Sequence, residues 1–178
     1  AITVTDGENV TISKEGVYVL SGTSTECSVI VDCADNAKVQ LVLDNLNITN
    51  ANSPAIYVKT AKKVFVTTAE NSTNILTTYD TFVADGTTNT DAVIFSKEDL
   101  VLNGEGTLQV TSSDNGITCK DDLKVTGGTY AISAQGHGLE ANDLIAICGG
   151  TFSINSDDAI HCSNDDEATL GALYISGG

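Results

Sequence analysis

The sequence predicts an all-β chain folded as a right-handed parallel β-helix, a solenoid of short stacked strands. Three features support this fold class: a period of 21 to 24 residues through the second half of the chain, alternation of apolar and polar residues after glycine pairs, and no helical periodicity. The handedness follows because crossovers between parallel strands are almost always right-handed. A leucine-rich repeat has a similar length, but its LxxLxLxxN pattern is absent.

The repeat is clearest in three segments that begin at Asp91, Asn115 and His137. A fourth begins at Asp158 and carries about seven extra residues before its glycine pair. Superposing the segments gives inward rows of apolar side chains, namely Leu108-Tyr130-Phe152, Val110-Ile132-Ile154, Val93-Ile117-Leu139-Ile160 and Leu102-Val125-Ile147-Ile175. One repeat cannot bury such rows alone, so neighbouring repeats must complete the core. The glycine pairs at 127–128 and 149–150 predict tight corners.

The rest of the chain is interpreted around this repeat. Less regular segments beginning at Val10, Ser28 and Ser53 are predicted to form the first turns, and residues 79–90 a surface loop. We expect one β-helix domain over residues 1–178, with further C-terminal coils missing because the sequence stops at Gly178 inside a repeat. Since a bare strand edge invites pairing, we also expect edge-to-edge contact with another chain at that end.

The charge is strongly negative. The chain has 24 acidic residues, eight cationic residues that are all lysines, and a formal charge of −16. This composition argues against nucleic acid and anionic membranes as partners, although it also fits plain solubility. No run of about 20 apolar residues is present, so no membrane insertion is expected. The start at Ala1 and the absence of methionine predict a mature segment whose signal peptide has been removed, hence an extracellular or cell-surface location.

The five cysteines and two histidines show no zinc-ligand spacing. Cys119 and Cys162 occupy the same position two repeats apart, about 9.6 Å at about 4.8 Å per strand, which is beyond disulfide reach. We therefore expect most thiols to be free and no structural zinc site.

Acidic residues recur at two corners of the repeat. One row is Asp91, Asn115, His137 and Asp158 with Asp114 and Asp157 beside it, and the other is Glu98, Asp121 and Asp143 flanked by Asp99 and Asp122. Carboxylates on adjacent strands lie about 4.8 Å apart, so one Ca²⁺ with oxygen ligands at about 2.3–2.6 Å can bridge them. We predict calcium ligands at Asp114, Asp121, Asp122, Asp143, Asp157 and Asp158, with Asp91, Glu98 and Asp99 as weaker candidates. The alternative is that these residues only form turns.

Catalysis is not expected, and no catalytic residue is assigned. His137-Gly138 and Asp157-Asp158 look superficially like the HG and DD motifs of polygalacturonases, but their order is reversed and no arginine exists. Lys120 or Lys124 could act as the base of a calcium-dependent pectate lyase. A lyase or polygalacturonase-like enzyme is therefore kept as the alternative function.

The order of several segments resembles a known family. These are GVYVLSGT, VQLVLDNLNITN, DAVIFSKEDLVLNGEGTL, NGITCKDDLKVTGGT and HGLEANDLIAICGGTF. They resemble the bacterial carbohydrate-binding β-helix family, formerly a domain of unknown function, over nearly the whole chain. The resemblance implies a pectate-lyase-like fold outside Gram-positive cells and non-catalytic binding of acidic plant polysaccharide, polygalacturonate or pectin, and of cellulose, with calcium in acidic sites. At residues 135–137 the sequence departs from the acidic step of that family.

Overall fold

The computed structural model describes residues 1–178, and its named strands pair in parallel within two sheets. The ten-stranded sheet contains β1 (Ile2–Thr3), β3 (Gly16–Thr25), β5 (Lys38–Asn50), β7 (Lys63–Thr68), β8 (Thr73–Thr78), β10 (Asp99–Gly104), β11 (Thr107–Ser112), β13 (Asp122–Ala134), β15 (Leu144–Asn155) and β17 (Ala172–Gly177). The seven-stranded sheet contains β2 (Val10–Ile12), β4 (Val29–Asp32), β6 (Ile56–Thr60), β9 (Ala92–Ser96), β12 (Asn115–Cys119), β14 (Leu139–Ala141) and β16 (Ile160–Cys162).

The strand pairing corrects the predicted fold class. Within the larger sheet β5 pairs with both β7 and β8, and β13 pairs with both β10 and β11, so six parallel strands form a closed ring. The smaller sheet is separate. The all-β prediction is confirmed, but the pairing is that of a barrel-like fold and not of the predicted right-handed β-helix solenoid.

The physical reason lies in the corners. Short strands separated by corners were predicted, whereas β13 is a 13-residue strand that runs through the Gly127-Gly128 corner, and β5 is a 13-residue strand that bends at Asp44-Asn45 without any glycine. Asn45 and Gly128 adopt φ of 57° and 97° there, a left-handed conformation that bends the strand where its pairing changes from one neighbouring strand to the other. Each long strand therefore pairs along both of its halves and closes the ring.

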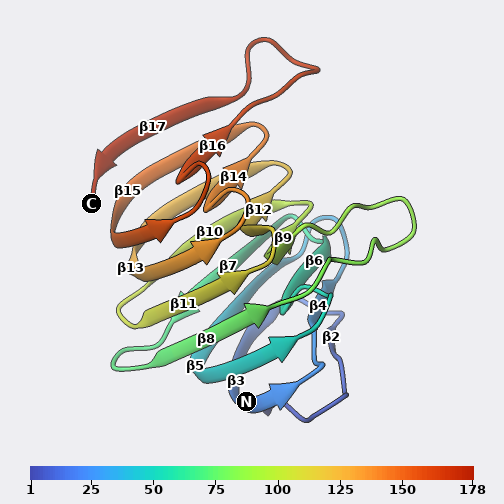
Figure 1. Cartoon of the computed structure of the whole chain (residues 1–178). Coiled ribbons are helices and arrows are strands. Elements are labelled where there is room, and N and C mark those ends of the chain that lie inside the picture. The colour runs from blue at the N-terminus through green and yellow to red at the C-terminus, as the bar shows by residue number, and fades with distance from the viewer.

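The predicted stacking of repeats is largely confirmed. Leu108 pairs with Tyr130, which pairs with Phe152, and the rows through Ile132 and Ile147 also have the predicted register. One row is wrong by a residue, because Ile94 and not Val93 pairs with Ile117. The rows bury a core cluster of 37 residues. In Figure 1 the strands of successive repeats lie one above another between the two termini.

At the C-terminal end, the apolar side chains of the last strand are much more exposed than those of the strand before it. Ile147 is 4% exposed, whereas Leu173 and Ile175 on the last strand, β17, are 49% and 58% exposed. These two side chains continue interior rows that no further strand covers. The expected contact with another chain at this end stays a prediction.

The loop after β8 and the state of the cysteines agree with the sequence-based predictions. The predicted loop, residues 79–90, is confirmed and extends to residue 91. It is held by Lys59 Nζ, 2.8 Å from Asp85 Oδ2, and by the Tyr57 hydroxyl, which donates to the same carboxylate at 3.1 Å. All five cysteines are unpaired, as expected. The structure contains no helix of the length and apolar character that crossing a membrane requires.

Candidate functional site

Three predicted calcium ligands meet where two repeats turn into the larger sheet. Asp121 and Asp122 stand at the start of β13, and Asp143 stands directly before β15, which pairs with β13. One carboxylate oxygen from each residue lies within 4.8 Å of the others. We call these three residues the acidic corner. Their spacing matches that expected for ligands sharing one cation.

The electrostatics of the acidic corner are unfavourable without a counterion. Burial, together with the charges of Asp99, Asp122 and Asp143, raises the pKa of Asp121 from 3.8 to about 6. Burial and the charges of Asp99 and Asp143 also raise the pKa of Asp122. A bound cation would offset this repulsion, because it favours the ionised carboxylates.

The extra residues of the fourth repeat also reach the acidic corner. The Asn164 side-chain amide donates to Asp143 Oδ1 at 2.7 Å, and the Gly171 backbone amide donates to the Asp143 carbonyl at 2.8 Å. The sequence shows this insertion as about seven extra residues, and no role was predicted for it. The acidic run Asp165-Asp166-Glu167 was the sequence feature that could have indicated a role for this insertion near a cation-binding corner.

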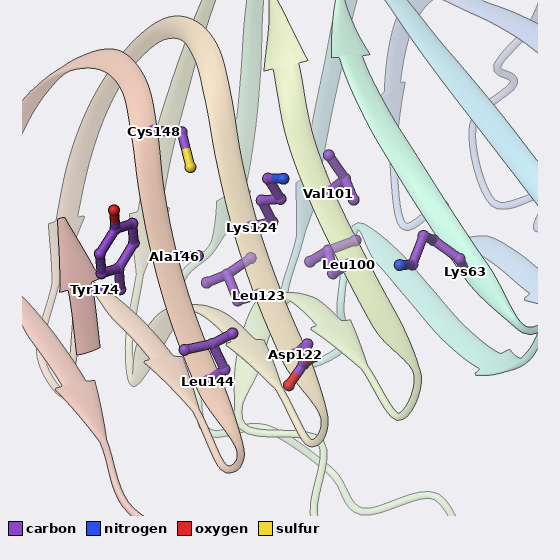
Figure 2. Close-up of a pocket in the computed structure, with 10 residues that line it drawn as sticks. All are labelled: Lys63, Leu100, Val101, Asp122, Leu123, Lys124, Leu144, Ala146, Cys148 and Tyr174. Atoms are coloured by element: carbon purple, nitrogen blue, oxygen red, sulfur yellow. The ribbon is translucent and has the colours of Figure 1, made fainter. Parts of the chain in front are cut away.

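A groove of about 250 Å³ runs across the outer face of the larger sheet beside the acidic corner. Figure 2 shows Lys63 and Tyr174 on opposite sides of the groove with Lys124 between them, and Asp122 close to the turn where its strand begins. Its wall is mostly apolar, with Val101 and Ala146 among the lining residues. Lys63 Nζ lies 2.9 Å from Asp99 Oδ2. Asp122 therefore belongs to both the acidic corner and the groove.

The remaining predicted ligands do not join the acidic corner. Asp99 pairs with Lys63, while Glu98 uses its backbone carbonyl to accept a hydrogen bond from Cys119 Sγ at 3.3 Å. Asp157 is exposed, and its backbone amide donates to Gly136 at 3.0 Å. Asp158 lies beside two histidines instead of other carboxylates.

Asp91 and Asp114 belong to a different polar group on the smaller sheet. Lys120 Nζ lies 3.9 Å from Asp91 Oδ2 and 3.8 Å from Glu140 Oε2. Burial raises the pKa of both Asp91 and Asp114, and buried Asp91 Oδ1 has no hydrogen-bond partner. Glu140, which was not among the predicted site residues, accepts hydrogen bonds from Asn115 and Thr118, both at 2.9 Å.

The chain is similar to a protein named for a carbohydrate-binding domain and to a solved polysaccharide lyase-like protein. A "carbohydrate-binding domain-containing protein" of Acetivibrio thermocellus is 38% identical over 122 residues, which cover 67% of this chain and 43% of that protein. The chain thus spans less than half the length of this relative. A solved gadolinium derivative of "the polysaccharide lyase-like protein from C. thermocellum" matches with a TM-score of 0.91 and 31% identity, covering 98% of this chain and 78% of that one. A family model for carbohydrate-binding domain-containing proteins matches residues 6–178, and the chain belongs to that family.

Proposed function

We propose that the chain binds an acidic plant polysaccharide of the polygalacturonate class through Ca²⁺ at the acidic corner, without cleaving it. The observation that carries this proposal is the double position of Asp122, which stands in the acidic corner and in the wall of the groove. A cation held there would lie at the edge of a surface on which a polymer chain can rest.

The donor set suits calcium. Ca²⁺ prefers oxygen ligands, takes six to eight of them and tolerates irregular geometry. Three carboxylates supply only part of that shell, so positions remain for water and for a carboxylate of the bound polymer. A uronate carboxylate can thereby share the ion with Asp122.

The groove supplies complementary contacts. Tyr174 is 59% exposed, so its ring is free to pack against the apolar face of a sugar. Lys124 adds positive charge to the groove of a chain whose formal charge is −16, while Lys63 is paired with Asp99. Lys124 and a bound divalent cation can attract uronate carboxylates where the bare chain would repel them.

An extracellular or cell-surface location is part of the proposal. A partial shell of three carboxylates suits the weak calcium affinities typical of extracellular modules, about 10⁻⁴–10⁻³ M. Cellulose is a second polysaccharide to test, because it offers the sugar faces without the carboxylates. A neutral glucan should bind independently of calcium if only the groove contacts it.

The proposal is tested by measuring the binding of polygalacturonate in millimolar Ca²⁺ and in chelator. We expect binding in calcium, at least about tenfold weaker binding in chelator, and neither new reducing ends nor 4,5-unsaturated products. The matched variant pair is Asp122→Asn and Asp157→Asn, since only the first carboxylate lies in the acidic corner. Calcium-independent binding, or equal effects of the two substitutions, would refute the role of the corner.

A polysaccharide lyase or hydrolase remains the second candidate function. It is favoured by Lys120 standing between Asp91 and Glu140, and by the buried Asp91 Oδ1 without a partner. A lysine next to carboxylates can donate and accept protons as a general acid or base. Product formation by the pure chain that disappears in Lys120→Ala would establish this reading in place of the non-catalytic one.

A further inference from the structure

Two histidines and one aspartate meet at another corner, beside the starts of β14 and β16 in the smaller sheet. His137 precedes β14, Asp158 precedes β16, and His161 lies within β16. One nitrogen or oxygen of each residue lies within 4.8 Å of the others. We call these three residues the histidine corner. The histidines are 24 positions apart in the sequence and are brought together by the pairing of β14 with β16.

Backbone packing holds His137 in place. Its backbone amide donates to Asn115 Oδ1 at 2.8 Å, and the next residue is Gly138. A Cβ on Gly138 would overlap the Ile154 side chain and the Ala159 carbonyl oxygen, so only glycine permits this approach to the following repeat. The imidazole of His137 is consequently fixed over the next turn of the chain.

The distances in the histidine corner are too long for hydrogen bonds. Asp158 Oδ2 lies 3.5 Å from His137 Nδ1 and 3.7 Å from His161 Nδ1. The first of these nitrogens is buried and has no hydrogen-bond partner, which is uncommon for a polar atom. Two ligands at about 2.05 Å from a tetrahedral ion are separated by about 3.3 Å. The observed separations are therefore close to those of ligands around one ion.

We propose that His137, His161 and Asp158 bind a borderline divalent cation of the Zn²⁺ type. Two imidazoles and one carboxylate are ligands that Zn²⁺ uses, and three protein ligands leave a fourth position for water. Asp158 is 59% exposed, so that position faces solvent. The bound ion ties two successive repeats together next to the exposed last strand.

Binding requires one local adjustment. The imidazole rings are stacked with centroids 4.2 Å apart and planes 6° apart, so their in-plane lone pairs run nearly parallel. One ring must rotate for both Nδ1 atoms to face the same ion. His161 is the freer of the two, since its side chain is 36% exposed against 25% for His137, and its Nε2 is hydrogen-bonded to the exposed Ser163 hydroxyl at 3.0 Å.

The histidine corner differs from the calcium role first expected of Asp158. Imidazole nitrogen is a poor ligand for Ca²⁺, which prefers oxygen, whereas it suits Zn²⁺. The inference is independent of polysaccharide binding, because none of the three residues lines the groove beside Asp122. Each proposal can therefore fail without the other.

The test is Zn²⁺ titration calorimetry in millimolar Ca²⁺, on a Cys148→Ser background that removes the exposed thiol. We expect one Zn²⁺ per chain, a rise in melting temperature of roughly 5–10 °C at saturating Zn²⁺, and a visible spectrum of tetrahedral Co²⁺. His161→Gln and His137→Gln should each weaken Zn²⁺ binding by about 30-fold or more.

The matched control is Asp157→Asn, which removes the neighbouring carboxylate and should leave Zn²⁺ affinity unchanged. If His137→Gln fails to fold, His161→Gln and the Co²⁺ spectrum of the parent chain still decide the matter. The proposal is overturned if Zn²⁺ does not bind below millimolar concentration, if both histidine variants bind it normally, or if Co²⁺ takes up only octahedral water-like coordination.

Discussion

The acidic corner and the histidine corner are built by the same backbone arrangement and differ in their donor atoms. In both, side chains from successive parallel repeats meet beside a turn into a paired strand. The acidic corner offers only oxygens, and the pKa of Asp121 rises to about 6 there, whereas the histidine corner offers two nitrogens and one oxygen. The repeat thus sets the spacing of potential ligands, and the side chains at each corner decide which ion fits.

The largest difference between the Ca²⁺ and Zn²⁺ affinities of the two corners is expected from Asp121→Asn combined with Asp143→Asn. Removing two of three carboxylates should weaken Ca²⁺ binding roughly 100-fold, about 2.7 kcal/mol, because neutral amides attract the ion less. Zn²⁺ affinity should stay within twofold. Calorimetry with each ion measures both effects, with Asp157→Asn as the control. Loss of both ions would mean that the corners are not independent.

The pH dependence of stability in chelator should identify the acidic corner. Because the folded-state pKa of Asp121 is raised from 3.8 to about 6, its contribution is fully present below about pH 4 and is lost as pH rises through about 6. We expect the free energy of unfolding to fall by on the order of 1–2 kcal/mol across this window, allowing for solvent screening. Denaturant unfolding measures it.

Substitution separates this effect from the general repulsion of an acidic chain. Asp121→Asn should flatten the decline between pH 4 and 6, while Asp157→Asn should preserve it. Millimolar Ca²⁺ should restore stability at pH 7 more than at pH 4. A chelator curve that rises through this window, or that is the same for both variants, would contradict the electrostatic description of the corner.

Polysaccharide binding in the groove should be affected by substitutions that leave ion binding at both corners unchanged. Tyr174→Ala should lower polygalacturonate affinity about tenfold, because an aromatic ring packed on a sugar carries a large share of such binding. It should leave the affinities for Ca²⁺ and Zn²⁺ unchanged. Tyr79→Ala is a matched control, since Tyr79 is 62% exposed on a loop outside the groove. Equal losses in both variants would remove the groove from the binding surface.

The smallest expected effect concerns the support of Asp143. Asn164→Ala removes the 2.7 Å hydrogen bond to Asp143 Oδ1 and should weaken Ca²⁺ binding about three- to fivefold, near 1 kcal/mol. Asn52→Ala, on an exposed turn elsewhere, serves as the comparison. Tighter Ca²⁺ binding in Asn164→Ala would show that the amide competes with the ion.

The sequence predicted the stacking of repeats because apolar alternation directly reports which side chains face a core. Leu108, Tyr130 and Phe152 share a row as expected. The row containing Ile117 was misplaced by one residue, since the loop before Asp91 hides where β9 begins. The closed ring was missed because a glycine corner looks the same in sequence whether a strand ends there or bends through it.

The two corners were predicted unequally for a related reason. The carboxylates of the acidic corner recur at one repeat position, so alignment alone brings Asp121 next to Asp143. His137 precedes its strand whereas His161 lies within the next one, and no fixed spacing connects them. Asn164 lies in an insertion that has no counterpart in the other repeats. Contacts between different repeat positions depend on how the corners bend, which the period does not encode.

The most direct measurement of the central claim is a crystal structure of the chain with Ca²⁺ and an oligogalacturonide. We predict one ion held by Asp121, Asp122 and Asp143, with a uronate carboxylate completing its shell and a sugar ring against Tyr174. An ion bound elsewhere, or a sugar bound on the smaller sheet near Lys120 with no contact to Asp122, would contradict it.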